Sequence, residues 1–379
     1  MDGLLTEDEL SFKKDIRGFV AKELLPNVEE WERRKQYAVE AAKKIADYGL
    51  FGILAPPEYG GLGGTCMEYL IASIEMAKAS VSLASIFGAP TGIFIDSMVK
   101  FGTQEQKDRY IPPVLEGEKI ACFALTEPAA GSDAANMATT AVRDGDEWVV
   151  NGGKTFITAA DVGAVCLFFA TVDRSLGTKG ITAFLVEMGT PGFTSGKIED
   201  LLGLHASSAG ELLFRDCRIP ASNLVGEIGR GLRIAFSSLD LGRIHCAGQA
   251  IGLAEAALEA TLTYTADREQ FGRPIGDFQG VQWMLADMSV QVDSAKLMAY
   301  RAARMADAGK NYTAEAAKAK LLASEVGSAV ASKAVQLHGG YGCTKDMPVE
   351  RYYRDAKLIE IYEGTSEIHR AVIARSLRS

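Results

Sequence analysis

Hydrophobic residues near the start of the chain recur at the spacing of one helix face. Phe12, Ile16, Phe19 and Val20 lie at positions i, i+4, i+7 and i+8, and polar residues fill the positions between them. The same texture continues to about residue 119, so this part of the chain is expected to be helical. Further helices are predicted over about residues 37–48, 66–79 and 82–101.

Proline and glycine mark the breaks in this helical region. The run 56–64 contains two prolines and four glycines and is expected to be a loop. Pro112 and Pro113 are expected to break the last helical pattern, because proline has no backbone N–H to donate. From about residue 120 the apolar runs have the length of strands. The predicted strands are 148–150, 154–158, 165–169, 181–186 and 212–220.

These strands are expected to form an antiparallel sheet or small barrel. Asn151-Gly152 is a turn signal between the first two of them. A parallel sheet needs helices between its strands, and no helical spacing occurs in this region.

The chain is helical again after Gly231. One predicted stripe contains Val281, Leu285, Met288 and Val292, and the next contains Leu322, Val326, Ala329 and Val330. These Ala-rich segments have short connections, as in a packed helical bundle. The sequence therefore predicts an α+β multidomain protein. Its parts are an N-terminal α-helical domain (1–119), a middle antiparallel β domain (120–227) and a C-terminal helical bundle (228–379).

Composition then excludes several classes of function. The chain has 379 residues with 47% hydrophobic content, enough for a large core, and a net charge of −9 with scattered Lys and Arg. A nucleic-acid-binding protein would carry a basic face, so none is predicted. The six Cys form no CxxC pair and no His lies near them at metal-ligand spacing, so no metal site and no disulfide framework are predicted.

The cellular location is predicted from the N-terminal residues and from the length of the apolar runs. The N-terminus is acidic without an apolar core, which excludes a signal or transit peptide. No uninterrupted apolar run has the length of a bilayer span. We expect a cytoplasmic protein without membrane association, with its thiols buried and reduced.

Two segments of the β domain have the chemistry of a ligand site. In the run Leu125–Asp133, Gly131 allows close approach, and two hydroxyls and several N–H groups are free for a polar ligand; an ordinary loop would look the same. Phe156 and Thr158 lie two residues apart and so face the same side of a strand. They suit a planar heterocycle held by stacking and one hydrogen bond, although an ordinary hairpin with Phe156 in the core fits equally well.

Two further segments suit phosphate. Arg268, in the run Asp267–Gly272 with Gln279 after it, has the geometry to bind a pyrophosphate, or it lies at a solvated helix end. Gly339 and Gly340, in the run Gln336–Gly342, permit close approach of phosphate or ribitol, or form a helix C-cap. No GxGxxG follows a strand, so a Rossmann nucleotide site is not supported.

Glu363 is the candidate base. It stands before Gly364 in an apolar run, Ile359–Ile368. Burial would raise its pKa and make it a better proton acceptor. The alternative is a surface glutamate near a helix end.

Together these segments resemble the acyl-CoA dehydrogenases across nearly the whole chain. The motifs are Thr126-Glu127-Pro128 with Gly131-Ser132-Asp133, Phe156-Ile157-Thr158, Arg268 with Gln270-Phe271-Gly272, Gln336 with Gly339-Gly340, and Tyr362-Glu363-Gly364-Thr365-Ser366-Glu367. The resemblance implies an N-terminal α domain, a middle β domain and a C-terminal four-helix bundle. It also implies FAD bound between the β domain and the bundle, reaching a neighbouring subunit of a homotetramer.

The resemblance assigns roles to residues at matching positions. Thr126 and Thr158 would hydrogen-bond the flavin ring and Phe156 would pack on it, where many relatives have Trp. The other FAD residues would be Leu125, Gly131, Ser132, Ile157, Arg268, Phe271, Gln279, Gln336, Gly339, Gly340, Thr365 and Glu367. Substrate contacts would come from Ser132, Asp240 and Arg243 on the CoA portion, and from Thr91, Gly242, Tyr362 and Gly364 nearer the acyl group.

The resemblance also implies the reaction. Glu363 would remove the α-proton of an acyl-CoA while the β-hydride passes to flavin N5, giving a trans-2-enoyl-CoA and passing electrons to an electron-transfer flavoprotein. Some relatives carry the base in an Asp-Leu-Glu-Arg pattern, which here reads Asp240-Leu241-Gly242-Arg243. Gly242 cannot act as a base, so Glu363 has no competitor there.

Small residues near the predicted acyl pocket indicate the size and shape of the acyl group. Gly88 to Gly92 are expected near the acyl pocket, and with Gly242 they predict space for a short, branched or alicyclic acyl group, including cyclohexane-carbonyl-CoA. No Arg or Lys occurs between Lys78 and Lys100, which disfavours a dicarboxylic acyl-CoA.

Three rival functions stay open. An acyl-CoA oxidase or flavin monooxygenase of the same fold would pass electrons to oxygen, and peroxide release would identify an oxidase. A non-enzymatic helical assembly protein would be colourless when pure. A catalytically inactive binding homologue would have no reason to keep Glu363.

Overall fold

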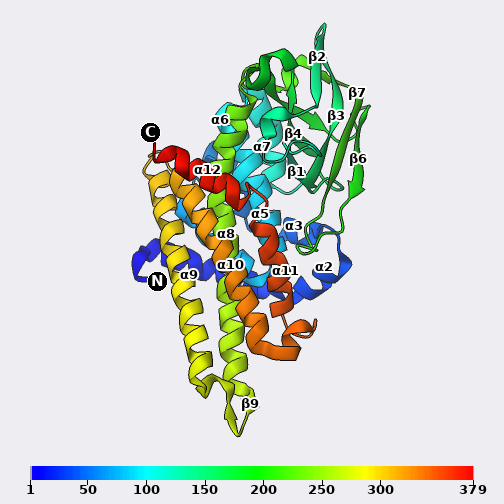
Figure 1. The fold of residues 1–379 in the computed structure, drawn as a ribbon. Coiled ribbons are helices and arrows are strands. Elements are labelled where there is room, and N and C mark those ends of the chain that lie inside the picture. Colours follow the sequence, from blue (N-terminus) through cyan, green and yellow to red (C-terminus); the bar gives the residue numbers. More distant parts are fainter. Residues whose placement is uncertain (1, 379) are drawn as a thin grey trace.

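The computed structural model describes residues 2–378 and shows helices, then a sheet, then helices along the chain (Figure 1). Ile16, Phe19 and Val20 are buried and Phe12 packs against the core, as the first stripe predicts. The short helix α2 and the helix α7 were not predicted. The N-terminal helices are α1 (Glu7–Phe19), α2 (Val28–Arg34), α3 (Val39–Asp47), α4 (Cys66–Ala79), α5 (Val81–Gly88), α6 (Asp96–Phe101) and α7 (Gln104–Leu115).

The helix predicted over 82–101 is divided in the structure. A π-helical stretch, Ala89–Ile95, separates α5 from α6 and contains Pro90. Proline cannot donate the regular backbone bond, and the wider turn accommodates it. The whole segment Val81–Phe101 is long and apolar enough to cross a membrane by length and composition, but 83% of the window that meets this test is buried inside the structure. It therefore has the character of a core segment.

Pro112 and Pro113 do not end the helical pattern, contrary to the prediction. Helix α7 continues through both to Leu115, and the Glu116 N–H donates to the Pro112 carbonyl at 3.0 Å to close the last turn. Ile111 and Val114, on either side of the pair, are buried. Tertiary packing of these residues therefore holds a turn that local propensity disfavours.

The middle part is one sheet in the order β6-β7-β3-β2-β4-β5-β8, with β1 beside β4. Most neighbours are antiparallel, as predicted, but β1 and β2 both pair with β4 in parallel. The strands are β1 (Ala121–Ala124), β2 (Thr140–Asp144), β3 (Glu147–Thr158), β4 (Val165–Thr171), β5 (Ile181–Glu187), β6 (Phe193–Ile198), β7 (Ala209–Pro220) and β8 (Leu224–Val225).

Asn151-Gly152 is not a turn, and this prediction was wrong. Strand β3 runs through it with a register shift against β7, and the Asn151 side chain bonds Asp216 across the sheet. A Cβ on Gly152 would lie 2.4 Å from Thr139 Oγ1. The glycine therefore permits a close approach between strands rather than a reversal of the chain.

The C-terminal part is helical apart from one short hairpin. In the predicted stripes Met288, Val292, Val326 and Val330 are buried, whereas Ala329 is exposed. The elements are α8 (Gly231–Asp267), β9 (Glu269–Gln270), β10 (Arg273–Pro274), α9 (Gln279–Asp307), α10 (Thr313–His338), α11 (Val349–Ile359) and α12 (Ser366–Ser376).

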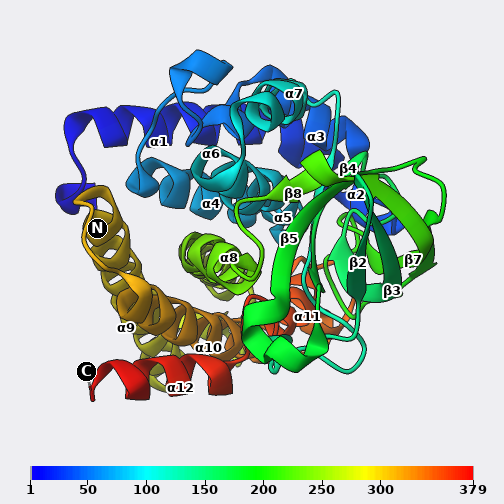
Figure 2. The same cartoon turned by 90° about the horizontal axis from the view of Figure 1, so that it is seen from above.

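Helix α8 lies at the centre of the molecule. Figure 2 shows it between the N-terminal helices on one side and α9 and α10 on the other. A Cβ on Gly252 would lie 2.3 Å from the Ile74 carbonyl, so α4 and α8 approach at backbone distance. Along its length α8 contacts the N-terminal helices, strand β5 of the sheet and the other helices of the bundle.

Cysteines and acidic residues form no metal centre in residues 2–378. No group of three His, Cys, Asp or Glu side chains there has the arrangement of a metal site. Five of the six cysteines are buried and free, as expected, but Cys343 is exposed.

Candidate active site

Glu363 lies in a short connection between two helices. Helix α11 ends at Ile359, and Thr365 caps α12 by accepting a hydrogen bond from the Ile368 N–H. Between them, in what we call the Glu363 loop (residues 360–365), Glu363 has φ +55° and Gly364 has φ +98°. A glutamate in the left-handed region costs about 1–2 kcal/mol, so packing must hold it there.

The Glu363 carboxylate packs directly on Gly242 of α8. A Cβ at position 242 would lie 2.8 Å from Oε2 and 3.1 Å from the carboxyl carbon. Oε2 is buried, and no group among residues 2–378 hydrogen-bonds it. Burial raises the pKa of Glu363 to about 7, against the positive charges of Arg243 and Lys320. The group is a partly ionised base at neutral pH, rather than the surface glutamate of the alternative interpretation.

Two side chains that the sequence did not single out, Lys320 and Gln249, anchor the Glu363 loop. Lys320 of α10 donates from Nζ to the Gly364 carbonyl at 2.7 Å, and Tyr362 donates to Gln249 Oε1 at 2.9 Å. Lys320 is fully buried in an alanine-rich stretch of helix. The sequence offers no clear signal for it, because Lys318 lies two positions earlier in the same alanine-rich stretch.

The two predicted flavin segments of the β domain lie side by side. The Thr155 N–H donates to the Thr126 carbonyl at 3.0 Å. Phe156 has φ +56° and is 61% exposed, so it is not in the core, while Ile157 is buried and Thr158 is half-buried. The strand is irregular between Lys154 and Ile157, and this turns the Phe156 ring out of the sheet.

A buried ion pair fixes these two segments to each other. Lys154 Nζ lies 2.7 Å from Glu127 Oε1 and also donates to the Leu125 carbonyl at 3.2 Å. Burial alone would raise the pKa of Glu127, but Lys154 and the N–H groups of Thr139 and Ala138 hold it below its usual value. The remaining predicted residues here, Gly131 and Ser132, are exposed and Thr126 is half-buried.

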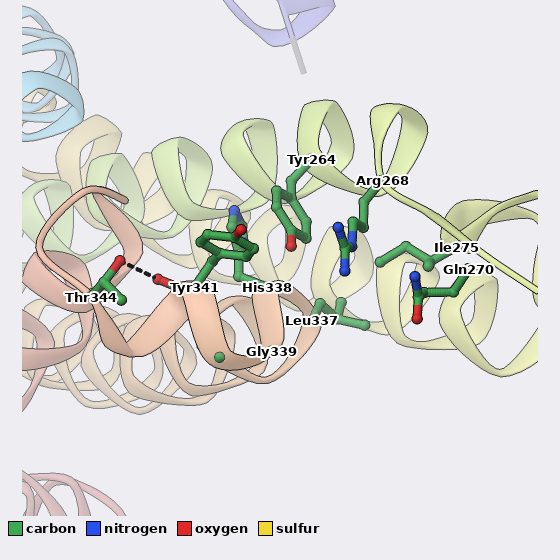
Figure 3. A pocket seen from close by; sticks show the side chains of 10 residues that line it. Tyr264, Arg268, Gln270, Ile275, Leu337, His338, Gly339, Tyr341 and Thr344 are labelled. Atoms are coloured by element: carbon green, nitrogen blue, oxygen red, sulfur yellow. Dashed lines mark hydrogen bonds between the residues drawn. The ribbon is translucent and has the colours of Figure 1, made fainter.

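Arg268 lines a cavity of about 510 Å³ together with Gly339 and Gly340, which come some 70 positions later in the chain. Figure 3 shows Arg268 and Gly339 on different segments around this cavity. Tyr264 stacks on His338 at 4.3 Å between ring centroids, and the Arg268 guanidinium lies 6.0 Å from the Tyr341 ring. The cavity is lined by Tyr264, Arg268, Gln270, Ile275, Leu337, His338, Gly339, Gly340, Tyr341 and Thr344.

The other predicted FAD residues do not line this cavity. Gln279, Gln336 and Glu367 are exposed, and Thr365 is the half-buried cap of α12. Phe271 is 94% exposed with φ +55° at the tip of the β9–β10 hairpin. Figure 1 places that hairpin at the opposite end of the molecule from the β domain. Within one chain, the predicted FAD residues therefore form separate groups.

Two of the three residues predicted for CoA, Asp240 and Arg243, lie on α8 beside Gly242, which Glu363 contacts; Ser132 is exposed on the β domain. Arg243 is buried on α8 and pairs with Asp240, which also accepts from the Thr313 hydroxyl. Burial raises the pKa of Asp240. Arg243 Nε has no partner among the described residues, so this guanidinium keeps an unused donor beside the base.

The glycines near Thr91 do not open the space that the sequence predicts. A Cβ on Gly88 would lie 2.1 Å from His245 Nε2, and one on Gly92 would lie 2.1 Å from the Tyr69 hydroxyl. His245 and Tyr69 thus occupy these positions, as Glu363 does at Gly242. Thr91 is fully buried, and its hydroxyl has no partner among residues 2–378. The small residues serve close packing rather than a wide pocket.

Comparison with known proteins covers the whole chain. Family models match residues 6–118 (acyl-CoA dehydrogenase, N-terminal domain), 122–217 (middle domain) and 229–378 (C-terminal domain). The chain is 45% identical to the short-chain specific acyl-CoA dehydrogenase of Clostridium acetobutylicum, with 99% of each covered. It is 46% identical to the acryloyl-CoA reductase (NADH) of Anaerotignum propionicum, covering 100% of this chain and 96% of that protein. The structure of butyryl-CoA dehydrogenase from Megasphaera elsdenii superposes with a TM-score of 0.96 at 41% identity, with 99% of each covered.

Proposed function

Since the chain belongs to the acyl-CoA dehydrogenase family of FAD-dependent oxidoreductases, we propose that it dehydrogenates a short, unbranched acyl-CoA between Cα and Cβ, with Glu363 as the α-proton base. One observation carries the proposal: a glutamate with a strained backbone packs against a glycine, and its Oε2 is buried without a hydrogen-bond partner among the described residues. Buried carboxylates are normally paired, and one left unpaired in a dry site is suited to accept a proton.

The chain's own groups account for the proton transfer. Glu363 accepts the α-proton at its carboxylate, and its pKa of about 7 is close to the working pH, which favours rapid transfer in either direction. The charge of Arg243 favours the ionised form before transfer. Packing of the carboxylate on Gly242 fixes its position, and such fixed placement is worth several orders of magnitude in rate.

The residues present fit FAD. Phe156, whose backbone has a positive φ, offers an exposed aromatic ring near the Thr126 segment and Thr158, as a flavin face requires. Gly339 and Gly340 stand in open space beside Arg268, where phosphate oxygens could approach the backbone. When bound, the flavin ring supplies a hydride acceptor at N5.

A neighbouring subunit would complete this site. In one chain the β9–β10 hairpin, which carries Phe271 and adjoins the Arg268 cavity, lies at the opposite end of the molecule from the β domain, which carries Phe156. Trp283, Val290 and Leu297 recur every seven residues along α9 and are 63, 66 and 52% exposed, a stripe suited to another helix. We therefore propose a homotetramer in which the hairpin of one chain contacts the FAD of the next. Trp283→Asp should lower both the sedimenting mass and the FAD content, and an unchanged tetramer would contradict this use of the stripe.

Short, unbranched substrates are favoured over branched or alicyclic ones. His245 and Tyr69 fill the space at Gly88 and Gly92, and the named relatives act on short or butyryl chains by their names. Cyclohexane-carbonyl-CoA therefore becomes the less favoured substrate.

The reverse reaction is a second candidate. One relative at 46% identity is named as a reductase of acryloyl-CoA with NADH. With a pKa near 7, protonated Glu363 could equally deliver a proton to Cα of an enoyl-CoA. An electron-transfer flavoprotein is the proposed redox partner in either direction.

Anaerobic flavin bleaching with a panel of acyl-CoA thioesters tests the proposal. Butyryl-CoA should bleach the 450-nm band faster than isobutyryl-, cyclohexane-carbonyl- or glutaryl-CoA. Fastest bleaching by the cyclohexane-carbonyl thioester would overturn the substrate assignment. Stoichiometric peroxide release in air would identify an oxidase, and a colourless protein unable to bind FAD would refute the enzymatic proposal.

A further inference from the structure

Lys320 is a buried cation that the proposed chemistry has not yet used. Its side chain is fully buried on α10, between Ala316, Ala319 and Ala323, which are buried as well. Burying a charge without a counter-ion is costly. Other buried lysines here have carboxylate partners, such as Lys154 with Glu127, but within residues 2–378 no ion pair includes Lys320. A lysine kept there in spite of that cost points to a role for its charge.

The ammonium of Lys320 contacts the residue after the base. Nζ donates to the Gly364 carbonyl at 2.7 Å, within the pair of left-handed residues Glu363 and Gly364. On the other side of Glu363, Tyr362 is held by Gln249. Lys320 therefore tethers the Glu363 loop directly after the base, and a charge-assisted bond of this kind is stronger than a neutral one.

The other ionisable groups around Glu363 leave Lys320 as the cation without a counter-ion. Arg243 on α8 also lowers the pKa of Glu363, but its charge is shared with Asp240. His369 on α12 is neutral, because burial lowers its pKa to about 3. Burial likewise raises the pKa values of Cys246 on α8, Tyr69 on α4 and Tyr362, so all three are uncharged. Glu360 is the remaining acidic group near the Lys320 side chain.

We propose that Lys320 is a positioning residue for the reaction: its ammonium holds the left-handed Glu363–Gly364 backbone and keeps the Glu363 carboxylate ionised by its charge. The proposal rests on the proposed role of Glu363 as base. Lys320 touches neither substrate nor cofactor in this role and acts only through the Glu363 loop.

Two substitutions separate the charge from the tether. Lys320→Met removes both the charge and the donor at nearly unchanged length, whereas Lys320→Gln removes the charge but keeps an N–H donor. Lys318→Met is the matched control, because Lys318 lies on the same helix, is partly exposed and pairs with Glu315. Lys320→Arg keeps the charge, so its Glu363 midpoint should lie closer to the wild-type value than the midpoints of the Met and Gln variants do.

The decisive readout is the ionisation of Glu363 itself, in the FAD-loaded protein without substrate. Infrared difference spectra over a pH titration detect the protonated carboxyl, and the band that disappears in Glu363→Gln identifies it. Both Lys320→Met and Lys320→Gln should move its midpoint upward by about one pH unit, while Lys318→Met should not. Flavin reduction by butyryl-CoA should then fall about fivefold at pH 7 and little at pH 9.

An unchanged Glu363 midpoint in a folded Lys320→Gln or Lys320→Met protein would overturn the proposal. If Lys320→Met does not fold, Lys320→Gln decides alone. If instead Glu363→Gln proves fully active, the base assignment fails. The infrared midpoint would in that case still show whether Lys320 controls the ionisation of Glu363, so the two failures are distinguishable.

Discussion

Two buried lysines near carboxylates show opposite arrangements in this molecule. In the β domain, Lys154 and Glu127 form a closed pair at 2.7 Å, and two backbone N–H groups complete the carboxylate's hydrogen bonds. In the bundle, Lys320 donates to a backbone carbonyl instead, and Glu363 Oε2 has no partner among the described residues. The pKa of Glu127 is held below its usual value, whereas burial raises that of Glu363 to about 7.

The difference distinguishes a carboxylate that stabilises the fold from one that takes part in the reaction. A carboxylate whose hydrogen bonds are all made stays ionised and fixed in position. Glu127, with its partner Lys154, therefore fixes the Thr126 and Phe156 segments relative to each other. A buried carboxylate oxygen without a partner is costly and reactive, and Glu363 Oε2 is kept in that state by packing on Gly242 and by the tether from Lys320. The same two residue types therefore serve as scaffold in one place and as base in the other.

Breaking the closed pair should have the largest effect on stability. Lys154→Met leaves Glu127 buried and unpaired, which should lower the free energy of unfolding by about 3–5 kcal/mol. Urea denaturation of the FAD-loaded protein measures it. The control is Lys197→Met, which breaks a largely exposed pair with Glu199 and should change stability by less than about 1 kcal/mol. Equal effects of the two substitutions would remove the distinction between the pairs.

Disturbing the Glu363 site should affect catalysis rather than stability. Gly242→Ala places a methyl group 2.8 Å from Glu363 Oε2 and displaces the carboxylate, so kcat/KM for butyryl-CoA should fall on the order of 10²-fold. Folding should be preserved, since alanine suits a helix interior. Gly18→Ala on α1 is the matched control, because a Cβ there meets nothing within 4 Å. Activity of Gly242→Ala within twofold of the control would show that the carboxylate does not depend on this contact.

The smallest expected effect is a difference in pH dependence between the two sites. Glu363 must be ionised to accept a proton, so kcat/KM should decline as the pH falls through about 7. Its raised pKa means that folding favours the protonated form, so Glu363 itself contributes less stability as the pH rises from its ordinary value of 4.5 through 7. Glu127 has a lowered pKa, and its contribution is lost only when the pH falls below about 4.5. An acid limb of the rate profile near pH 4.5 would contradict the assignment.

The sequence predicted the individual members of the site better than their contacts. Glu363 and Gly242 were each identified from local motifs, but the packing of one on the other joins residues 121 positions apart. For Phe156 the sequence left a ligand-facing position and a core position open, and the structure places the residue at the surface, 61% exposed, where the strand is irregular. The order of helical and β regions followed from periodicity, which local sequence encodes directly.

The errors arose where distant packing overrides local signals. Gly152 suggested a turn, yet it serves the approach of Thr139 from a neighbouring strand. Gly88 and Gly92 suggested empty space, yet His245 and Tyr69 occupy it. The roles of Lys154 and Lys320 could not be inferred, because their partners lie 27 and 44 residues away in the chain.

Proton exchange at the substrate α-carbon tests the central claim most directly. FAD-loaded protein is incubated with butyryl-CoA in D₂O without an electron acceptor, and deuterium at Cα is followed by mass spectrometry. The wild-type protein should introduce deuterium, and Glu363→Gln, with its FAD still bound, should do so at least about 10²-fold more slowly. Exchange by the Gln variant at the wild-type rate would contradict the assignment of Glu363 as the base.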